Sequence, residues 1–134
     1  MADESDPVEA GELVMRRILN KSEFVNLELE LPVNRLAFRP TSDDTDGISL
    51  YRSAFTTAAT IANSGSNPLG YFVAEISTEN VRDEGLSVVQ DPLSDGPRGH
   101  CLIPEIRVET RDATKLQQFA LARLASVNLV HKPA

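Results

Sequence analysis

The chain has 134 residues, which is the size of one ordinary domain with a buried core of its own. Hydrophobic residues make up 41% of it and charged residues 25%, a globular composition that argues against a disordered or membrane-embedded protein. The formal net charge of −7 argues against nucleic acid as a general partner, because affinity for a phosphate backbone comes largely from Lys and Arg.

The beginning of the sequence and its single cysteine indicate a cellular compartment. Residues 1–5 lack both the basic end and the apolar run of a signal peptide. Cys101 has no second cysteine with which to form a disulfide within the chain. No apolar run approaches the roughly 18 residues that cross a bilayer. We therefore expect a cytoplasmic protein without a membrane segment.

The first part of the chain predicts a flexible acidic tail over residues 1–6, followed by a helix over residues 7–20. Asp6, Pro7 and Glu9 have the pattern of a helix start, with a capping oxygen, a proline in the first turn and an acid three residues on. Apolar residues then recur at helical spacing. They are Ala10, Leu13, Val14 and Ile18.

The period changes in the sequence NLELELPV, residues 26–33. Leucines alternate with glutamates there, which predicts a strand with one apolar and one acidic face, ended by Pro32. RLAF, residues 35–38, and ISLYR, residues 48–52, predict two further short strands. Pro, Asp and Gly residues between them favour a turn.

Helices and strands follow in the middle of the chain. Ser53 predicts the cap of a helix over residues 54–62. YFVAEIS, residues 71–77, is a near-continuous apolar run and predicts a central strand. A short helix over residues 78–84 would begin at a Ser-Thr pair and end at Gly85.

The last third of the chain predicts short strands in LSVVQ, residues 86–90, and in CLIPEIRVE, residues 101–109, and then a helix over residues 112–127. One face of that helix would be apolar. The residues on it are Leu116, Phe119, Ala120, Leu124 and Val127.

This order of elements predicts an α+β fold. We expect a single domain over residues 7–134, with a mixed or antiparallel sheet of about five or six short strands. An N-terminal, a central and a C-terminal helix would pack on that sheet.

Metal and cofactor sites are not indicated. Asp43, Asp44 and Asp46 precede Gly47 as in a calcium loop, but the position that requires a bidentate Glu is Ser53. One Cys and two His are too few for structural zinc. Glycine loops for phosphate and the common hydrolase motifs are also missing from the sequence. We therefore expect no metal and no cofactor.

The stretch DPLSDGPRGHCLIP, residues 91–104, is either an active-site loop or a turn-rich connection between strands. His100 and Cys101 are adjacent, so in a strand they point to opposite faces and cannot act as base and nucleophile on each other. We interpret the loop first as a structural hairpin that folds His100 back beside SVVQ. A catalytic role of His100 is the alternative.

Arginines in the first half of the chain are the other polar candidates. Arg35 and Arg39 could clamp a carboxylate or phosphate with two hydrogen bonds each. Pairing with surface acids is the commoner explanation of such arginines, because the chain has twenty Asp and Glu residues.

Several segments between residues 13 and 104 resemble a group of small bacterial proteins without an assigned activity. The segments are LVMRRIL, RLAFRPTSDDTDGISLYR, YFVAEISTENVRDEGLSVVQDPL and GHCLIPEI. Asp91, Pro92 and His100 fall on the most distinctive positions of that group, whereas NRLAF matches its Arg-Ser-Ser-Ala-Ala-Phe form only in part. The resemblance implies a bacterial cytosolic origin, and it adds Asp91 to the candidate ligand-binding residues.

These observations favour a small acidic protein-interaction module of the bacterial cytosol, an accessory or immunity-like component of a conflict or regulatory system. Its partner would be a protein, steered by the acidic N-terminal segment and the glutamate face. The sequence identifies neither this partner nor the oligomeric state.

Two alternatives stay open. One is an enzyme acting on a nucleotide-like or phosphorylated small molecule, for example an NAD-using transferase. In it Arg35 or Arg39 would hold the anion, His100 would act as acid or base, and one of three aspartates would orient it. These are Asp43, Asp44 and Asp46. The other alternative is nucleic-acid binding by the last helix through Arg111, Lys115 and Arg123, against which the net charge argues.

Overall fold

The computed structural model describes residues 3–134 and contains a six-stranded antiparallel sheet with the order β4-β5-β2-β1-β3-β6. The strands are β1 (Leu13–Leu19), β2 (Ile48–Arg52), β3 (Tyr71–Ser77), β4 (Val89–Gln90), β5 (His100–Ile103) and β6 (Leu129–His131). The helices are α1 (Ala58–Asn63), α2 (Thr78–Asp83) and α3 (Lys115–Ser126), with 3-10 turns η1 (Arg35–Phe38) and η2 (Val108–Thr110). The predicted α+β fold with an antiparallel sheet is confirmed.

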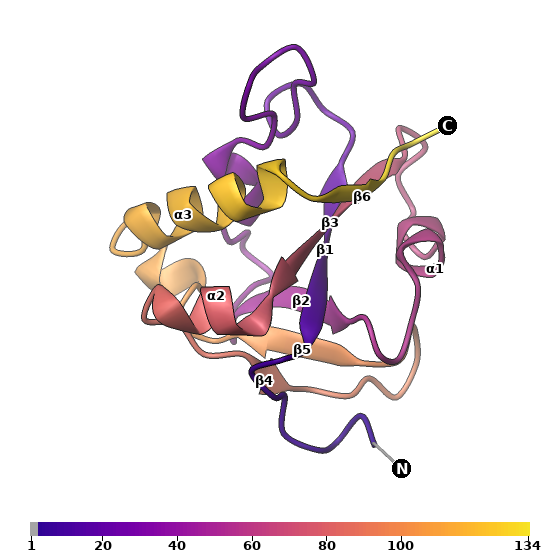
Figure 1. Ribbon diagram of the computed structural model, residues 1–134, viewed down its shortest axis with the longest axis vertical. Coiled ribbons are helices and arrows are strands. Elements are labelled where there is room, and N and C mark those ends of the chain that lie inside the picture. The colour runs from indigo at the N-terminus through magenta and orange to yellow at the C-terminus, as the bar shows by residue number, and fades with distance from the viewer. Residues whose placement is uncertain (1–2) are drawn as a thin grey trace.

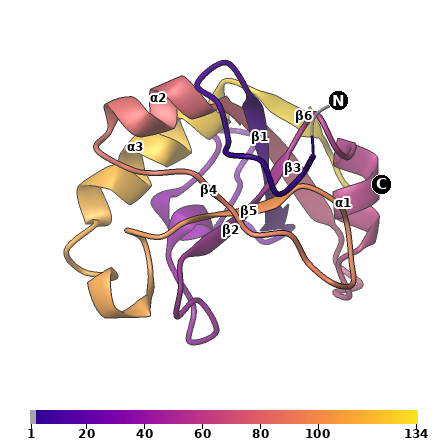
Figure 2. The ribbon, with the colours of Figure 1, turned by 90° about the horizontal axis from the view of Figure 1, so that it is seen from below.

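The two faces of the sheet are covered differently. Helices α2 and α3 lie on one face together with η1, and α1 lies on the other (Figures 1 and 2). The first face, here called the core face, is aliphatic. Its fully buried side chains include Val14, Ile18, Phe38, Ile48, Leu50, Ile103 and Leu121. The second face, here called the α1 face, has a smaller apolar cluster of Met15, Tyr51, Ile61, Ala62 and Val73.

The predicted N-terminal helix over residues 7–20 is wrong, because residues 13–19 form β1. This strand lies between β2 and β3 and is buried on both faces: Val14 and Ile18 face the core and Met15 faces α1. A strand covered on both sides has no strict alternation of apolar and polar residues. Its buried positions therefore have a spacing that a helix would also give.

The predicted strand over residues 26–33 is also wrong. The segment is a loop joined only by an isolated bridge between Val25 and Val33. Asn26 closes it, because its backbone N–H donates to the Pro32 carbonyl and its side-chain oxygen accepts from the N–H of Glu28. This Asx turn outcompetes the extended conformation that the Leu-Glu alternation favours.

Other short elements differ from their predictions in type or in where they begin. RLAF is the 3-10 turn η1 rather than a strand, capped by the Asn34 side chain. Helix α1 begins after Thr57, whose hydroxyl accepts from the Thr60 N–H, so the predicted cap at Ser53 is wrong. The strand ISLYR, the central strand YFVAEIS and the short helix capped by Ser77 are confirmed as β2, β3 and α2.

Residues 3–6, which belong to the predicted acidic tail, lie against the sheet; residues 1 and 2 of that tail are outside the described residues. The Arg52 guanidinium donates to the carbonyls of Glu4 and Asp6. It also forms a 2.7 Å ion pair with Glu12, and its side chain is only 3% exposed. Arg52 therefore ties the N-terminal segment to the end of β2.

Within residues 3–134, no helix combines the length and the apolar character that a bilayer crossing requires.

Candidate functional site

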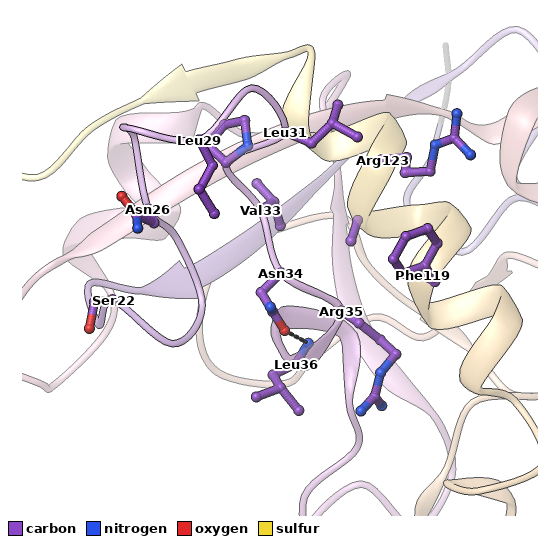
Figure 3. Close-up of a pocket in the computed structure, with 12 residues that line it drawn as sticks. Ser22, Asn26, Leu29, Leu31, Val33, Asn34, Arg35, Leu36, Phe119 and Arg123 are labelled. Carbon is purple, nitrogen blue, oxygen red and sulfur yellow. Dashed lines mark hydrogen bonds between the residues drawn. The ribbon is translucent and has the colours of Figure 1, made fainter.

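The outer side of α3 and the loop over residues 26–32 enclose a groove of about 420 Å3, which apolar and polar side chains line together (Figure 3). We call it the leucine groove. Its apolar lining consists of Leu29, Leu31, Pro32, Val33, Leu36, Phe119 and Ala122. Figure 3 shows Leu29 and Leu31 on the loop side and Phe119 on the helix side. The two walls come from segments almost ninety residues apart in sequence.

Helix α3 turns a different side to the core than its sequence predicts. Its buried residues are Gln118, Leu121, Ala122 and Ala125. The side chains expected to face inward are largely exposed: Leu116 by 84%, Phe119 by 54% and Val127 by 77%. The predicted apolar face is therefore wrong for these three residues, and it points outward.

The buried amide of Gln118 explains this orientation. Its nitrogen donates to the Arg111 carbonyl at 2.8 Å and to the Thr114 hydroxyl at 3.1 Å, and its oxygen accepts from Arg35 at 2.9 Å. A polar side chain is tolerated in a core when its hydrogen bonds are made there. Because Gln118 faces inward, the side of α3 with Leu116, Phe119 and Val127 faces away from the core.

Charged side chains surround the leucine groove. Arg35 and Arg123 line it. Glu28 and Glu30 are exposed on the loop over residues 26–32, but they are not among the lining residues. Within residues 3–134, neither glutamate has an ion-pair partner within 4.0 Å. The groove thus combines apolar side chains with two arginines, and two exposed glutamates lie on the same loop as Leu29 and Leu31.

A polar chain of three side chains lies on the α1 face. His100, at the start of β5, is 6% exposed. Its Nδ1 lies 2.9 Å from the Asp91 carbonyl oxygen and 3.2 Å from Asp91 Oδ2, and its Nε2 lies 2.9 Å from Ser49 Oγ. The register places Tyr51 opposite His100, so Ser49, two residues away on β2, faces the same side.

The partners of His100 determine which atom donates each hydrogen bond. Both groups near Nδ1 are acceptors, a carbonyl and a carboxylate, so Nδ1 carries the hydrogen. In the neutral imidazole Nε2 is then an acceptor, and the Ser49 hydroxyl donates to it. The same direction of hydrogen bonds activates a serine in nucleophilic catalysis.

A second pocket, of about 360 Å3, lies beside Ser49. We call it the arginine pocket, because Arg16, Arg17 and Arg39 line it together with a single carboxylate, Asp44. Arg16 is fixed by hydrogen bonds to the carbonyls of Ala37 and Ser49, and burial lowers the pKa of its guanidinium.

The other two arginines differ in how they are held. Arg17 donates to the Ile61 carbonyl and the Ser64 hydroxyl, and its guanidinium lies 5.0 Å from the centre of the Tyr71 ring. Arg39 is exposed, and its side chain forms no hydrogen bond or ion pair with a group of residues 3–134. Arg39 is thus the guanidinium of this pocket with the most freedom to contact a ligand.

The structure brings together some of the candidate residues and separates others. Asp91 contacts His100, and Arg39 shares a pocket with Ser49. Arg35 instead donates to Gln118 beneath α3, so the sheet separates it from His100. The loop over residues 91–99 joins β4 to β5 as a hairpin, with the Asp91 N–H donating to the His100 carbonyl.

Ser49 was missed by sequence reasoning, because 51 residues separate it from His100 and only the β2–β5 register joins them. Within residues 3–134, none of the aspartates predicted to orient His100, which are Asp43, Asp44 and Asp46, forms a hydrogen bond or ion pair with it. Asp91 occupies that position. Within residues 3–134, no group of three or more His, Cys, Asp or Glu residues is arranged to hold a metal ion.

Cys101 faces away from this chain of side chains. It is fully buried in the core, and burial raises the pKa of its thiol to about 12. A thiol with so high a pKa is almost wholly protonated at neutral pH and a poor nucleophile.

Comparison with protein-family models, with curated proteins and with solved structures finds no match to this chain.

Proposed function

We propose that this protein is a protein-interaction module that binds its partner in the leucine groove. The observation that carries the proposal is the outward orientation of α3, which leaves Phe119 more than half exposed while a glutamine occupies the core. Contiguous exposed apolar surface is costly in a monomer and commonly marks an interaction site. Aromatic side chains in such a patch are frequent anchors of binding energy.

The charges around the groove indicate the chemistry of the partner. Glu28 and Glu30 are exposed on the loop that carries Leu29 and Leu31, and the chain as a whole has a net charge of −7. We infer a partner segment with apolar side chains for the groove and Lys or Arg residues beside them for these two glutamates. Attraction between opposite charges would raise the rate of association and select against acidic segments.

The cellular role that we propose is an accessory or immunity-like component of a conflict or regulatory system in the bacterial cytosol. Such a component acts by occupying another protein rather than by turning over a substrate. A groove of this size, large enough for a few side chains, suits capture of one short segment.

Selection from a displayed library of random peptides tests the proposal. We expect the immobilised protein to enrich peptides with two or more apolar residues next to Lys or Arg. Phe119→Asp should lower the affinity of an enriched peptide at least tenfold, because a charge would replace the apolar anchor. Leu93→Asp is the matched control, since Leu93 is also a large exposed apolar residue but does not line the groove.

A charge reversal separates this partner from other occupants. The double variant Glu28→Lys and Glu30→Lys should enrich acidic instead of basic flanking residues. If the unmodified protein enriches no peptide more strongly than the Phe119→Asp protein does, the proposal is contradicted. If the protein self-associates with increasing concentration and Phe119→Asp does not, the groove binds a second copy of the chain and not the proposed partner.

A further inference from the structure

The arginine pocket and the Ser49–His100–Asp91 chain form a second site whose polar residues are separate from those of the leucine groove. Three features occur together there. A serine hydroxyl is hydrogen-bonded to a buried imidazole, the imidazole is oriented by a carbonyl and a carboxylate, and the serine lines a pocket with excess positive charge.

We propose that Ser49 is a nucleophile that attacks carboxylic esters carrying an anionic group. His100 is its general base, and the arginine pocket binds the anion. The inference goes beyond the proposed interaction function and does not depend on it, because the two sites share only the side chain of Leu36 among their lining residues.

The chemical step uses the hydrogen bond between Ser49 and His100. As Ser49 Oγ forms a bond to the ester carbonyl carbon, its proton passes to Nε2 of His100. The tetrahedral intermediate then breaks its bond to the alkoxy oxygen, which leaves as the alcohol with that proton. Water attacks the acyl-serine with His100 again as base. The products are one acid and one alcohol, and Ser49 recovers its hydrogen.

The anionic group of the substrate is inferred from the charges in the pocket. Arg16, Arg17 and Arg39 face one carboxylate, that of Asp44. The guanidinium groups of Arg16 and Arg17 already donate to backbone or hydroxyl oxygens, which fixes them in place. Arg39 is then the group best able to form a bidentate contact with a carboxylate or phosphate.

Asp91 acts through His100 as a positioning residue. Its carbonyl and its carboxylate both lie near Nδ1, so the backbone alone preserves the tautomer when the carboxylate is removed. Asp91→Asn should therefore lower the rate of the covalent step by weaker stabilisation of the imidazolium, with little change in reagent binding.

A fluorophosphonate reagent, which phosphonylates an activated serine and releases fluoride, is the first probe. We expect one adduct, located on Ser49 by peptide mass spectrometry and absent in Ser49→Ala. His100→Gln should slow the labelling by a factor of about 10² to 10⁴, the usual contribution of a general base. Asp91→Asn should lower the maximal labelling rate while leaving the half-saturating reagent concentration unchanged.

Two esters test the anion specificity. We expect 4-nitrophenyl succinate, which carries a free carboxylate, to be hydrolysed in preference to neutral 4-nitrophenyl butyrate. Arg39→Gln should reduce this preference roughly tenfold or more, as expected for loss of a charge-assisted hydrogen bond. Ser49-dependent hydrolysis without any preference would overturn the assignment of the arginine pocket.

A thiol variant gives a result even if His100→Gln does not fold. Ser49→Cys should react with iodoacetamide at neutral pH faster than Ser42→Cys, an exposed control without a histidine partner. Cys101 does not interfere, because it is buried. Equal reaction rates of the two introduced thiols, together with no phosphonylation of Ser49 in the unmodified protein, would refute the proposal.

Discussion

The two faces of the sheet differ in the kind of side chains that they bury. On the core face, aliphatic side chains pack under α2, α3 and η1, and most of the burial is apolar. On the α1 face, a single short helix covers a small apolar cluster, and polar side chains continue the surface of the sheet. Ser49, His100 and Glu75 are among them, each hydrogen-bonded to another side chain.

This difference between the two faces indicates which parts of the molecule stabilise the fold and which parts can serve its function. Burial of apolar area stabilises the fold, whereas a hydrogen-bonded polar group gives a smaller net contribution because it exchanges one set of hydrogen bonds for another. We infer that the core face accounts for most of the stability. The α1 face and the outer side of α3 are then the parts of the molecule that can serve binding or chemistry.

The largest effect is expected from a truncation on the core face. Phe38 is completely buried in the main cluster, so Phe38→Ala should lower the free energy of unfolding by about 3 to 5 kcal/mol. Urea denaturation measures this loss. A change below about 1 kcal/mol would break the comparison between the two faces.

The next effect concerns the ion pair between Glu12 and Arg52. The hydrogen bond from Arg52 lowers the pKa of the Glu12 carboxyl below its usual value, so the pair stabilises the protein above the unfolded-state pKa. That contribution is lost as the pH falls through the lowered pKa of the folded state. We expect Glu12→Gln to cost about 1 to 3 kcal/mol at pH 7, the range for a hydrogen bond to a charged group.

Unfolding curves of this variant and of the unmodified protein between about pH 7 and pH 3 measure the effect. The difference between them should shrink as the pH falls. A constant difference over this range would show that the charge of Glu12 contributes nothing.

A smaller effect is expected on the α1 face. Ser49→Ala removes the hydroxyl that donates to His100 Nε2, which leaves one acceptor of a buried ring without its partner. The expected cost is about 1 kcal/mol by thermal unfolding, together with complete loss of Ser49 labelling. A loss comparable to that of Phe38→Ala would mean that the polar chain serves mainly the fold.

The smallest effect is expected on the outer side of α3. Leu116 is 84% exposed, so Leu116→Gln should change the free energy of unfolding by no more than about 0.5 kcal/mol. Leu121→Ala, one turn along on the buried side of the same helix, is the control and should cost about 2 to 5 kcal/mol. Similar losses in the two variants would contradict the orientation of α3.

Much of the fold could be predicted from local patterns. The apolar run of YFVAEIS forms β3, and the Ser77 cap with Gly85 bounds α2; Gly85 has a φ of +78°, which favours glycine. Where one local signal competed with another, prediction failed. Residues 13–19 are apolar enough for either period, and Asn26 overrides the alternation of the leucine segment.

The sites depended on contacts that are distant in sequence. Asp91 and His100 were candidates, but Ser49 joins them only through the pairing of β2 with β5. The leucine groove depends on which side of α3 faces the core. The hydrogen bonds of Gln118 to Arg35, Arg111 and Thr114 hold the helix in that orientation. The spacing of apolar residues predicts that a polar residue such as Gln118 is exposed, because its hydrogen-bond partners cannot be identified from the local sequence.

The most direct test of the proposed interaction function is the affinity of a library-selected peptide for the unmodified protein and for Phe119→Asp, measured by calorimetry on samples with matched unfolding free energies. Our account predicts an affinity at least tenfold weaker for Phe119→Asp while its stability changes by less than about 0.5 kcal/mol. An unchanged affinity would contradict the leucine groove as the binding site.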